Sequence, residues 1–214
     1  MIFDTVFFDF DGVLAESEQI KTDAFRTVYA DQPADVVQRI VAYHKANAGI
    51  SRVVKIAHIE RAFLGRPGDD ESVAALARRY SETVVDQVIA APEVAGAGAF
   101  LDAFRDRLRM FVISGTPETE LGPIVAARGM ADYFTEVRGS PRLKPDIGAE
   151  LRDRHGLDMA RTVFVGDAPT DYHAAHALGC AFVGRVHPGA INPFPVGTTI
   201  VADLTGLDGL VTGA

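Results

Sequence analysis

The most informative stretch of the chain is Thr5-Val-Phe-Phe-Asp-Phe-Asp-Gly-Val-Leu14. It opens with β-branched and aromatic residues and then changes to two carboxylates, Asp9 and Asp11, and to the turn-forming residue Gly12. A short run of this composition is typical of a strand buried in a parallel sheet, because a helix needs more residues. We therefore expect a first strand over residues 5–9 that ends in carboxylates.

Further runs of the same kind follow, and helical stretches alternate with them. The expected later strands are Met110–Ser114, Thr162–Asp167, Ala181–Gly184 and, after a loop rich in Pro and Gly, Thr199–Ala202. The expected helices between them are Glu118–Arg128, Pro145–His155 and Thr170–Leu178. Alternation of strand and helix is typical of an α/β protein, so the sequence predicts a Rossmann-like, doubly wound parallel sheet.

The spacing of these strands is uneven. About a hundred residues separate the first two strands, far more than one crossover helix requires, and most of this stretch has a helical pattern. The expected helices are Glu18–Ala30, Ala34–Ala48, Arg52–Leu64 and Asp70–Ile89, followed by Ala97–Leu108 as the crossover to the sheet. We therefore predict an α/β core formed by residues 1–15 and 91–214, with a helical cap inserted at residues 16–90.

Composition and charge argue against several classes of protein. The 214 residues include 29 acidic and 21 basic ones, and the formal net charge is −8. This balance argues against nucleic acid and membranes as partners, because both favour clustered Lys and Arg. The single cysteine, Cys180, excludes an intramolecular disulfide and a zinc site of several thiolates. The sequence carries neither a signal peptide pattern nor an apolar run of ~18 residues, so we expect a cytoplasmic protein of undetermined oligomeric state.

Polar residues gather at the predicted carboxyl ends of the strands, where an open parallel sheet binds its ligand. They are Asp9 and Asp11 at and after the end of the first strand, Ser114, Gly115 and Thr116 at the second, Asp167 at the end of the strand expected over Thr162–Asp167, and Asp171 one helical turn further on. So many carboxylates in one place are unfavourable unless a cation lies among them. A hard divalent cation with oxygen ligands meets this need, and Mg²⁺ suits a site that holds few carboxylates and a phosphate.

These residue types suggest phosphoryl transfer. Asp9 can attack a phosphorus centre and form an acyl phosphate. Asp11 can protonate the leaving oxygen and then activate the water that hydrolyses the intermediate. Ser114 would donate a hydrogen bond to the transferring phosphoryl group, and Lys144 would offset charge between the phosphate and Asp9.

The motifs around these residues resemble the four ordered motifs of the haloacid dehalogenase superfamily. They are Asp9-Phe-Asp-Gly-Val-Leu, Val112-Ile-Ser-Gly-Thr116, Leu143-Lys-Pro-Asp146 and Val165-Gly-Asp-Ala-Pro-Thr-Asp171. The helical insertion after the first motif resembles the C1-type cap of the phosphoglycolate phosphatase and β-phosphoglucomutase branch. Motifs and cap together span nearly the whole chain.

The resemblance implies roles for individual residues. Asp9 would be the nucleophile and Asp11 the general acid and base. Mg²⁺ would be held by the Asp9 side chain, the Asp11 backbone carbonyl and Asp167, with Asp171 at the metal directly or through water. The other interpretation of Asp171 is a cap for the helix that follows it.

Individual positions favour one branch of this superfamily. The presence of Asp11 argues against haloacid dehalogenases and phosphonoacetaldehyde hydrolases, which lack or replace it. β-Phosphoglucomutases typically carry Glu-Asp in the fourth motif and a His in the first cap helix, where this chain has Gly166-Asp167 and Lys21. We therefore predict a phosphatase for a small phosphorylated metabolite, either a sugar phosphate or a phosphoglycolate-like acid. The alternatives are a phosphomutase of the β-phosphoglucomutase type and a catalytically silent binding protein on the same fold.

The predicted cap carries one element that resembles the mutases. Gly49-Ile-Ser-Arg52 is similar to the segment with which a mutase cap holds the non-transferring phosphate, and Lys55 shares a helix face with Arg52. These two cations would bind an anionic group on the substrate, and the alternative is a solvated helix face. Asp203 ends the last strand at a similar height, and its role is open.

Overall fold

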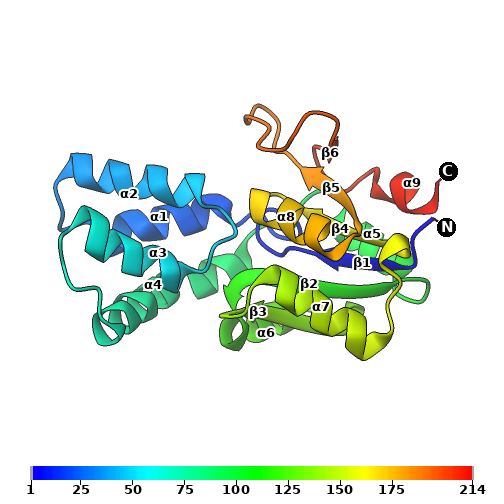
Figure 1. Ribbon diagram of the computed structural model, residues 1–214, viewed down its shortest axis with the longest axis horizontal. Helices are drawn as coiled ribbons and strands as arrows, with labels where there is room; N and C mark the ends of the chain where they lie inside the picture. The colour runs from blue at the N-terminus through cyan, green and yellow to red at the C-terminus, as the bar shows by residue number, and fades with distance from the viewer. Residues whose placement is uncertain (1, 214) are drawn as a thin grey trace.

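The computed structural model describes residues 2–213 and shows a six-stranded sheet with a helical insertion (Figure 1). The strands are β1 (Thr5–Phe8), β2 (Arg109–Pro117), β3 (Glu136–Ser140), β4 (Thr162–Gly166), β5 (Ala181–Arg185) and β6 (Thr199–Val201). Their order is β3-β2-β1-β4-β5-β6, and every neighbouring pair is parallel. The predicted doubly wound α/β fold is confirmed.

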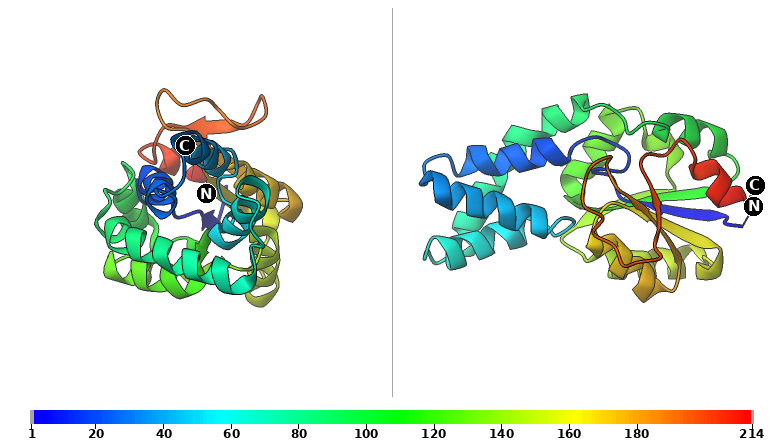
Figure 2. Two further views of the ribbon diagram at one scale, coloured as in Figure 1. Left: turned by 90° about the vertical axis from the view of Figure 1, so that its left-hand side faces the viewer. Right: turned by 90° about the horizontal axis from the view of Figure 1, so that it is seen from above.

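Helices cover both faces of the sheet, as the right-hand view of Figure 2 shows. The core helices are α5 (Ala97–Phe104), α6 (Glu118–Ala127), α7 (Lys144–His155), α8 (Pro169–Leu178) and α9 (Leu207–Thr212). Successive strand residues point to opposite faces, so Phe7 packs under α7 and α8 while Phe8 packs under α5, α6 and α9. Phe7 also meets the rings of Phe111 and Phe164 edge to face, at centroid distances of 5.6 and 6.0 Å.

The sheet topology determines where a ligand site can form. From β1 the chain proceeds to β2 and β3 on one side, and it then returns to β4 on the other side of β1. The carboxyl ends of β1 and β4 therefore mark the point where strand order reverses, which is where open α/β sheets bind ligands.

The helical insertion lies between β1 and β2 and forms the left part of Figure 1. Its elements are α1 (Glu18–Val28), α2 (Ala34–Ala46), α3 (Arg52–His58), a π-helical turn (Ile59–Phe63) and α4 (Asp70–Ala90). Buried side chains such as Phe25, Ile40 and Ile56 hold these helices together. The two connections to the sheet run side by side, because Glu16 N–H donates to the Pro92 carbonyl at 2.9 Å. We refer to residues 16–90 as the cap.

Four details of the prediction differ from the structure. The helix predicted over Arg52–Leu64 is α-helical only to His58 and continues as the π-helical turn. The strand β3 and the six-residue helix α9 were not predicted. The strand β2 extends beyond Ser114 to Pro117, so Gly115 and Thr116 lie within it. No helix among residues 2–213 is long and apolar enough to cross a membrane.

Candidate active site

Three carboxylates meet at the reversal point of the sheet. Asp9 follows β1, Asp167 follows β4, and Asp171 lies in the first turn of α8, with one oxygen from each within 4.8 Å of the others. Burial raises the pKa of Asp9 to about 7, and burial together with neighbouring Asp9 raises the pKa of Asp167. Asp9 and Asp171 are buried and Asp167 is half-buried. Such a set of close carboxylate oxygens fits a hard divalent cation such as Mg²⁺, which would relieve the repulsion among the three carboxylates.

Lys144 lies beside the same cluster at the start of α7. Its ammonium is 3.0 Å from an Asp9 oxygen and donates to Asp171 Oδ1 at 2.5 Å. Burial alone would lower the pKa of Lys144, but the attraction of Asp171 and Asp9 outweighs burial and holds that pKa above its usual value. The lysine is therefore a fixed positive charge next to Asp9.

Asp171 uses both carboxylate oxygens within the protein. While Oδ1 accepts from Lys144, Oδ2 accepts the Ala168 N–H at 3.0 Å and closes the first turn of α8. The side chain is fully buried. A Cβ on Gly166 would lie 2.2 Å from the Asp171 Cβ, so this close approach requires glycine before Asp167. Asp171 thus stabilises the helix start and also orients Lys144.

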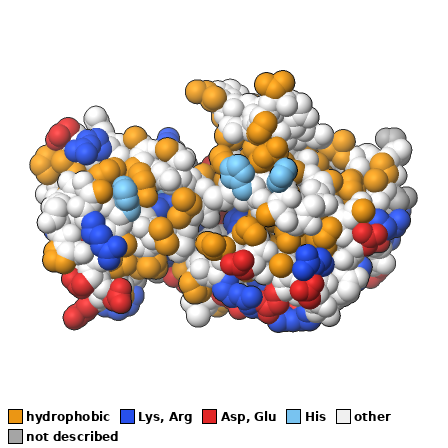
Figure 3. Space-filling model, in the orientation of Figure 1, with side chains coloured by type: hydrophobic (Ala, Val, Ile, Leu, Met, Phe, Trp, Pro, Cys, Tyr) orange, Lys and Arg blue, Asp and Glu red, His pale blue; other side chains and the backbone are white. Residues whose placement is uncertain are grey.

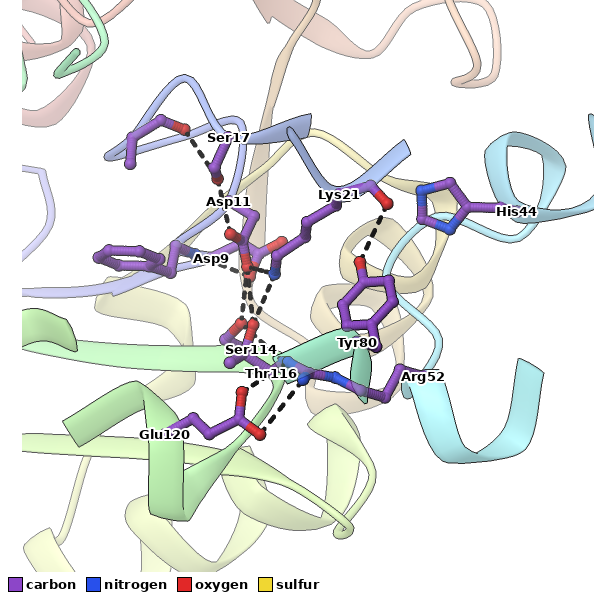
Figure 4. Close-up of polar contacts among 12 residues, drawn as sticks. Asp9, Asp11, Ser17, Lys21, His44, Arg52, Tyr80, Ser114, Thr116 and Glu120 are labelled. Carbon is purple, nitrogen blue, oxygen red and sulfur yellow. Dashed lines mark hydrogen bonds and ion pairs between the residues drawn. The ribbon is translucent and has the colours of Figure 1, made fainter. Parts of the chain in front are cut away.

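Asp11 faces the cluster from the loop after β1, and three side chains hold its carboxylate (Figure 4). Ser17 donates to Oδ1 at 2.6 Å, Thr116 donates to Oδ2 at 2.9 Å, and Lys21 of α1 contacts Oδ2. Burial raises the pKa of Asp11, but Lys21 and the hydroxyl donors outweigh burial, so the net pKa is lowered. The cap thus supplies the cation that keeps this core carboxylate ionised.

The end of β2 completes the core side of the site. Ser114 Oγ accepts the Thr116 N–H at 3.1 Å and lies 3.5 Å from an Asp11 oxygen. Gly115 lies against the cap, because a Cβ at this position would be 2.5 Å from the Gly49 carbonyl oxygen. The structure thus brings Ser114, Gly115 and Thr116 to the reversal point of the sheet.

The two cap cations predicted to bind substrate have different surroundings. Arg52 pairs with Glu120 of α6, with Nη2 at 2.8 Å from Oε2, and its guanidinium lies over the Tyr80 ring at 4.6 Å from the centroid. Lys55 contacts His44 Nδ1 at 3.2 Å. Both cations are buried. On this face of α3, Arg52 therefore connects the cap to the core, whereas Lys55 has no acidic partner among residues 2–213.

The cap lies against the core around a cavity of about 1270 Å³, which both parts line. Gly49 touches Gly115, Thr170 Oγ1 is 3.5 Å from the Ala48 carbonyl, and Arg52 reaches Glu120. Figure 3 shows the hollow between the cap and the protruding loop that precedes β6. The cap therefore contacts the core beside the carboxylate cluster, at the end of β2, at α6 and at the start of α8.

Several site residues were not predicted. Lys21 was noted only as a departure from the mutase pattern, and its position ten residues after Asp11 on the first cap helix was the available signal. His44 and Glu120 carried no signal, because their roles depend on how the cap packs on the core. Asp203 accepts from the Thr205 N–H at 3.0 Å and from its hydroxyl at 2.6 Å, which gives it a role in a local turn.

The fold and the site define a class of protein. The model of the haloacid dehalogenase-like hydrolases matches residues 3–179, so the chain belongs to that family and is a hydrolase. Among its relatives, the phosphoglycolate phosphatase of Rhodospirillum rubrum is 32% identical over 83% of this chain and 77% of the relative. That of Pasteurella multocida is 28% identical over 86% of each chain.

Solved structures share the fold at lower identity. A predicted phosphoglycolate phosphatase from Haemophilus somnus 129PT has a TM-score of 0.78 at 20% identity and covers 98% of each chain. A variant of CbbY from Rhodobacter sphaeroides, in complex with xylulose-(1,5)bisphosphate, has a TM-score of 0.78 at 19% identity, covering 97% of this chain and 96% of CbbY. The HAD-hydrolase YfnB from Bacillus subtilis, bound to magnesium, has a TM-score of 0.75 at 13% identity, covering 99% and 100%.

Proposed function

We propose that the protein is a Mg²⁺-dependent phosphatase that hydrolyses a small phosphorylated metabolite through an aspartyl-phosphate intermediate. The observation that carries this proposal is the setting of Asp9, which is buried between two further carboxylates and the ammonium of Lys144. The Lys144 charge opposes the effect of burial on the pKa of Asp9 and so favours the ionised carboxylate that acts as the nucleophile. Asp11 and Ser114 lie 3.5 Å apart near the ends of β1 and β2, where a leaving group and a phosphoryl oxygen would meet them.

The reaction follows from these positions in two steps. An oxygen of Asp9 forms a bond to phosphorus while the bond to the ester oxygen breaks, and Asp11 gives its proton to the leaving alkoxide. In the second step Asp11 takes a proton from water, and the water oxygen attacks the phosphorus of the acyl phosphate. The phosphorus–carboxylate bond breaks, which releases inorganic phosphate and regenerates Asp9. Ser114 and Lys144 stabilise the charge on the transferring phosphoryl group in both steps.

The metal would be held by Asp9, Asp167 and the Asp11 backbone carbonyl, with Asp171 directly or through water. When bound, Mg²⁺ neutralises phosphate charge and orients the phosphoryl group for in-line attack. The close carboxylate oxygens of this chain support that assignment, and the related YfnB was solved with magnesium.

The substrate class follows from the cavity and from the relatives. We propose that residues 16–90 act as a mobile cap that closes over a small molecule and opens to release products. A sugar phosphate and a phosphoglycolate-like acid are both compatible with this cavity, and the names of the relatives favour the acid. The phosphomutase alternative requires a free Arg52 for a second phosphate, whereas Arg52 is paired with Glu120.

A phosphate-release assay tests the proposal. Purified protein is incubated with p-nitrophenyl phosphate and Mg²⁺, with the isosteric variant Asp9→Asn as the control. We expect phosphate release that needs Mg²⁺ and that is abolished in Asp9→Asn. Release at or below the level of that control would indicate a binding protein. With a sugar 1-phosphate, formation of the isomeric phosphate in place of free phosphate would indicate a mutase.

A further inference from the structure

Lys55 is a buried cation that has no acidic partner among the residues that the structure describes. Its side chain lines the cavity between cap and core, and only 3% of the residue is exposed. Within residues 2–213 it forms no ion pair, and its one hydrogen-bonding contact is with His44 Nδ1 at 3.2 Å. Burial, with the nearby charge of Lys21, lowers the pKa of Lys55 to about 7. An anion bound in the cavity would favour the charged ammonium and offset the cost of burying it.

The other cap cations that line the cavity are engaged differently. Lys21 contacts the Asp11 carboxylate, and Arg52 is paired with Glu120 at 2.8 and 3.2 Å. Lys45 is exposed to solvent on α2. Lys55 is therefore the buried cap cation whose charge is left for a ligand.

His44 provides a second donor on the same wall of the cavity. Its Nδ1 faces the Lys55 ammonium, which can only donate, so the ring proton resides on Nε2. Burial and the neighbouring Lys55 lower the pKa of His44 to about 3, so the ring stays neutral. The ring is fixed by packing on Phe25, at a centroid distance of 4.6 Å. A charged donor and a neutral donor on one wall suit an anion with two or more oxygens.

We propose that Lys55 and His44 form a subsite for a second anionic group of the substrate. The substrate would then be a phosphorylated acid or a bisphosphate, with its ester phosphate at Asp9 and its second anion at Lys55. This inference rests on the proposed phosphatase function. The two cations of α3 would then have different roles, because Lys55 binds the ligand while Arg52 connects the cap to the core.

Matched substrate pairs test the subsite. 2-Phosphoglycolate and 2-hydroxyethyl phosphate share a two-carbon skeleton and differ in a carboxylate, and fructose 1,6-bisphosphate and fructose 1-phosphate differ in a phosphate. In one of the two pairs, we expect at least a tenfold higher kcat/KM for the compound that carries the second anionic group. The pair that shows this preference identifies the second anion as a carboxylate or a phosphate. In Lys55→Met this preference should be lost through KM, while Arg78→Met, which removes a positive charge from the exposed surface of α4 outside the cavity, should keep it.

A binding measurement separates failure of this inference from failure of the proposed function. Titration calorimetry on Asp9→Asn, with the same two pairs, needs no turnover. The subsite is supported if Asp9→Asn binds the compound with the second anionic group more tightly and if this preference disappears in the double variant of Asp9→Asn and Lys55→Met. This result would support the subsite even if no phosphatase activity is found. Equal affinities within both pairs, or a preference that survives Lys55→Met, would overturn it.

Discussion

The ammonium of Lys21 in the cap contacts the carboxylate of Asp11 in the core, and Thr116 bridges the two by accepting from Lys21 at 2.6 Å and donating to Asp11 at 2.9 Å. The contact couples the position of the cap to the protonation of the proposed general acid and base. While Lys21 is in place, the lowered pKa of Asp11 favours the ionised form that accepts a proton from water. Proton donation to the leaving group requires this contact to loosen.

Replacing Lys21 should therefore change the pH dependence of turnover. In Lys21→Met, burial of Asp11 is no longer opposed by that cation, so the pKa of the carboxyl should rise. The low-pH limb of the kcat profile, where Asp11 must be ionised to activate water, should move to higher pH by the same amount. Arg78→Met, which removes a positive charge from the exposed surface of α4 outside the cavity, should leave the limb in place. A Lys21→Met enzyme with reduced kcat and an unmoved limb would contradict the coupling.

The core of the site could be predicted from the sequence because parallel strands end at one edge of the sheet. Asp9, Ser114 and Asp167 each follow or end a run of buried β-branched and aromatic residues. The strand β3 was missed because it lies at the sheet edge and carries Glu136 and Arg138, so it lacks the apolar run of a central strand.

The cap side of the site could be predicted only in part. Helical spacing placed Arg52 and Lys55 on one face, which the structure bears out by burying both. Spacing does not determine what that face packs against. The partner Glu120 is 68 residues away from Arg52 in the chain and His44 is on another helix, so both contacts depend on tertiary packing.

The ion pair between Arg52 and Glu120 should hold the cap closed. Arg52→Ala and Glu120→Gln should therefore reduce kcat/KM by similar factors for p-nitrophenyl phosphate and for 2-phosphoglycolate. The double variant should have a kcat/KM no lower than that of either single variant. The coupling energy between Arg52 and Glu120 should be about 1–3 kcal/mol. If Arg52 instead binds the substrate anion, Arg52→Ala will raise KM for 2-phosphoglycolate far more than for p-nitrophenyl phosphate, and Glu120→Gln will not reproduce this.

A steric change at Gly115 should block cap closure without unfolding the core. The Cβ of Gly115→Ala would lie 2.5 Å from the Gly49 carbonyl oxygen, so the cap would have to move away from the site. We expect kcat/KM to fall by about 100-fold, with the thermal unfolding temperature close to that of the original protein. Gly122→Ala on α6 is the control, because its Cβ would meet no atom within 4 Å. Equal activity of the two variants would show that this contact is not required for catalysis.

The edge strand β3 should lose stability in acid through Glu136. This carboxylate is paired with Arg138 at 3.1 Å, Arg154 at 2.7 Å and His155 at 2.6 Å. Figure 3 shows acidic and basic side chains gathered on the lower right of the molecule, in the region of β3 and α7. Burial alone would raise the pKa of Glu136, but these partners lower it from 4.5 to about 2. Because the folded-state pKa is depressed, the pairing stabilises the fold above pH 4.5, and this contribution is lost as the pH falls towards about 2.

Glu136→Gln should therefore destabilise the protein by about 1–2 kcal/mol at pH 7, a value that allows for solvent screening. The difference from the original protein should shrink between pH 4.5 and about 2, because protonation removes the same charge from Glu136. Urea unfolding at pH 7 and at pH 3 measures both values. Glu82→Gln, at an exposed position of α4 without an ion pair within residues 2–213, should change little at either pH. A destabilisation by Glu136→Gln that stays constant with pH would mean that packing, and not charge, anchors β3 to α7.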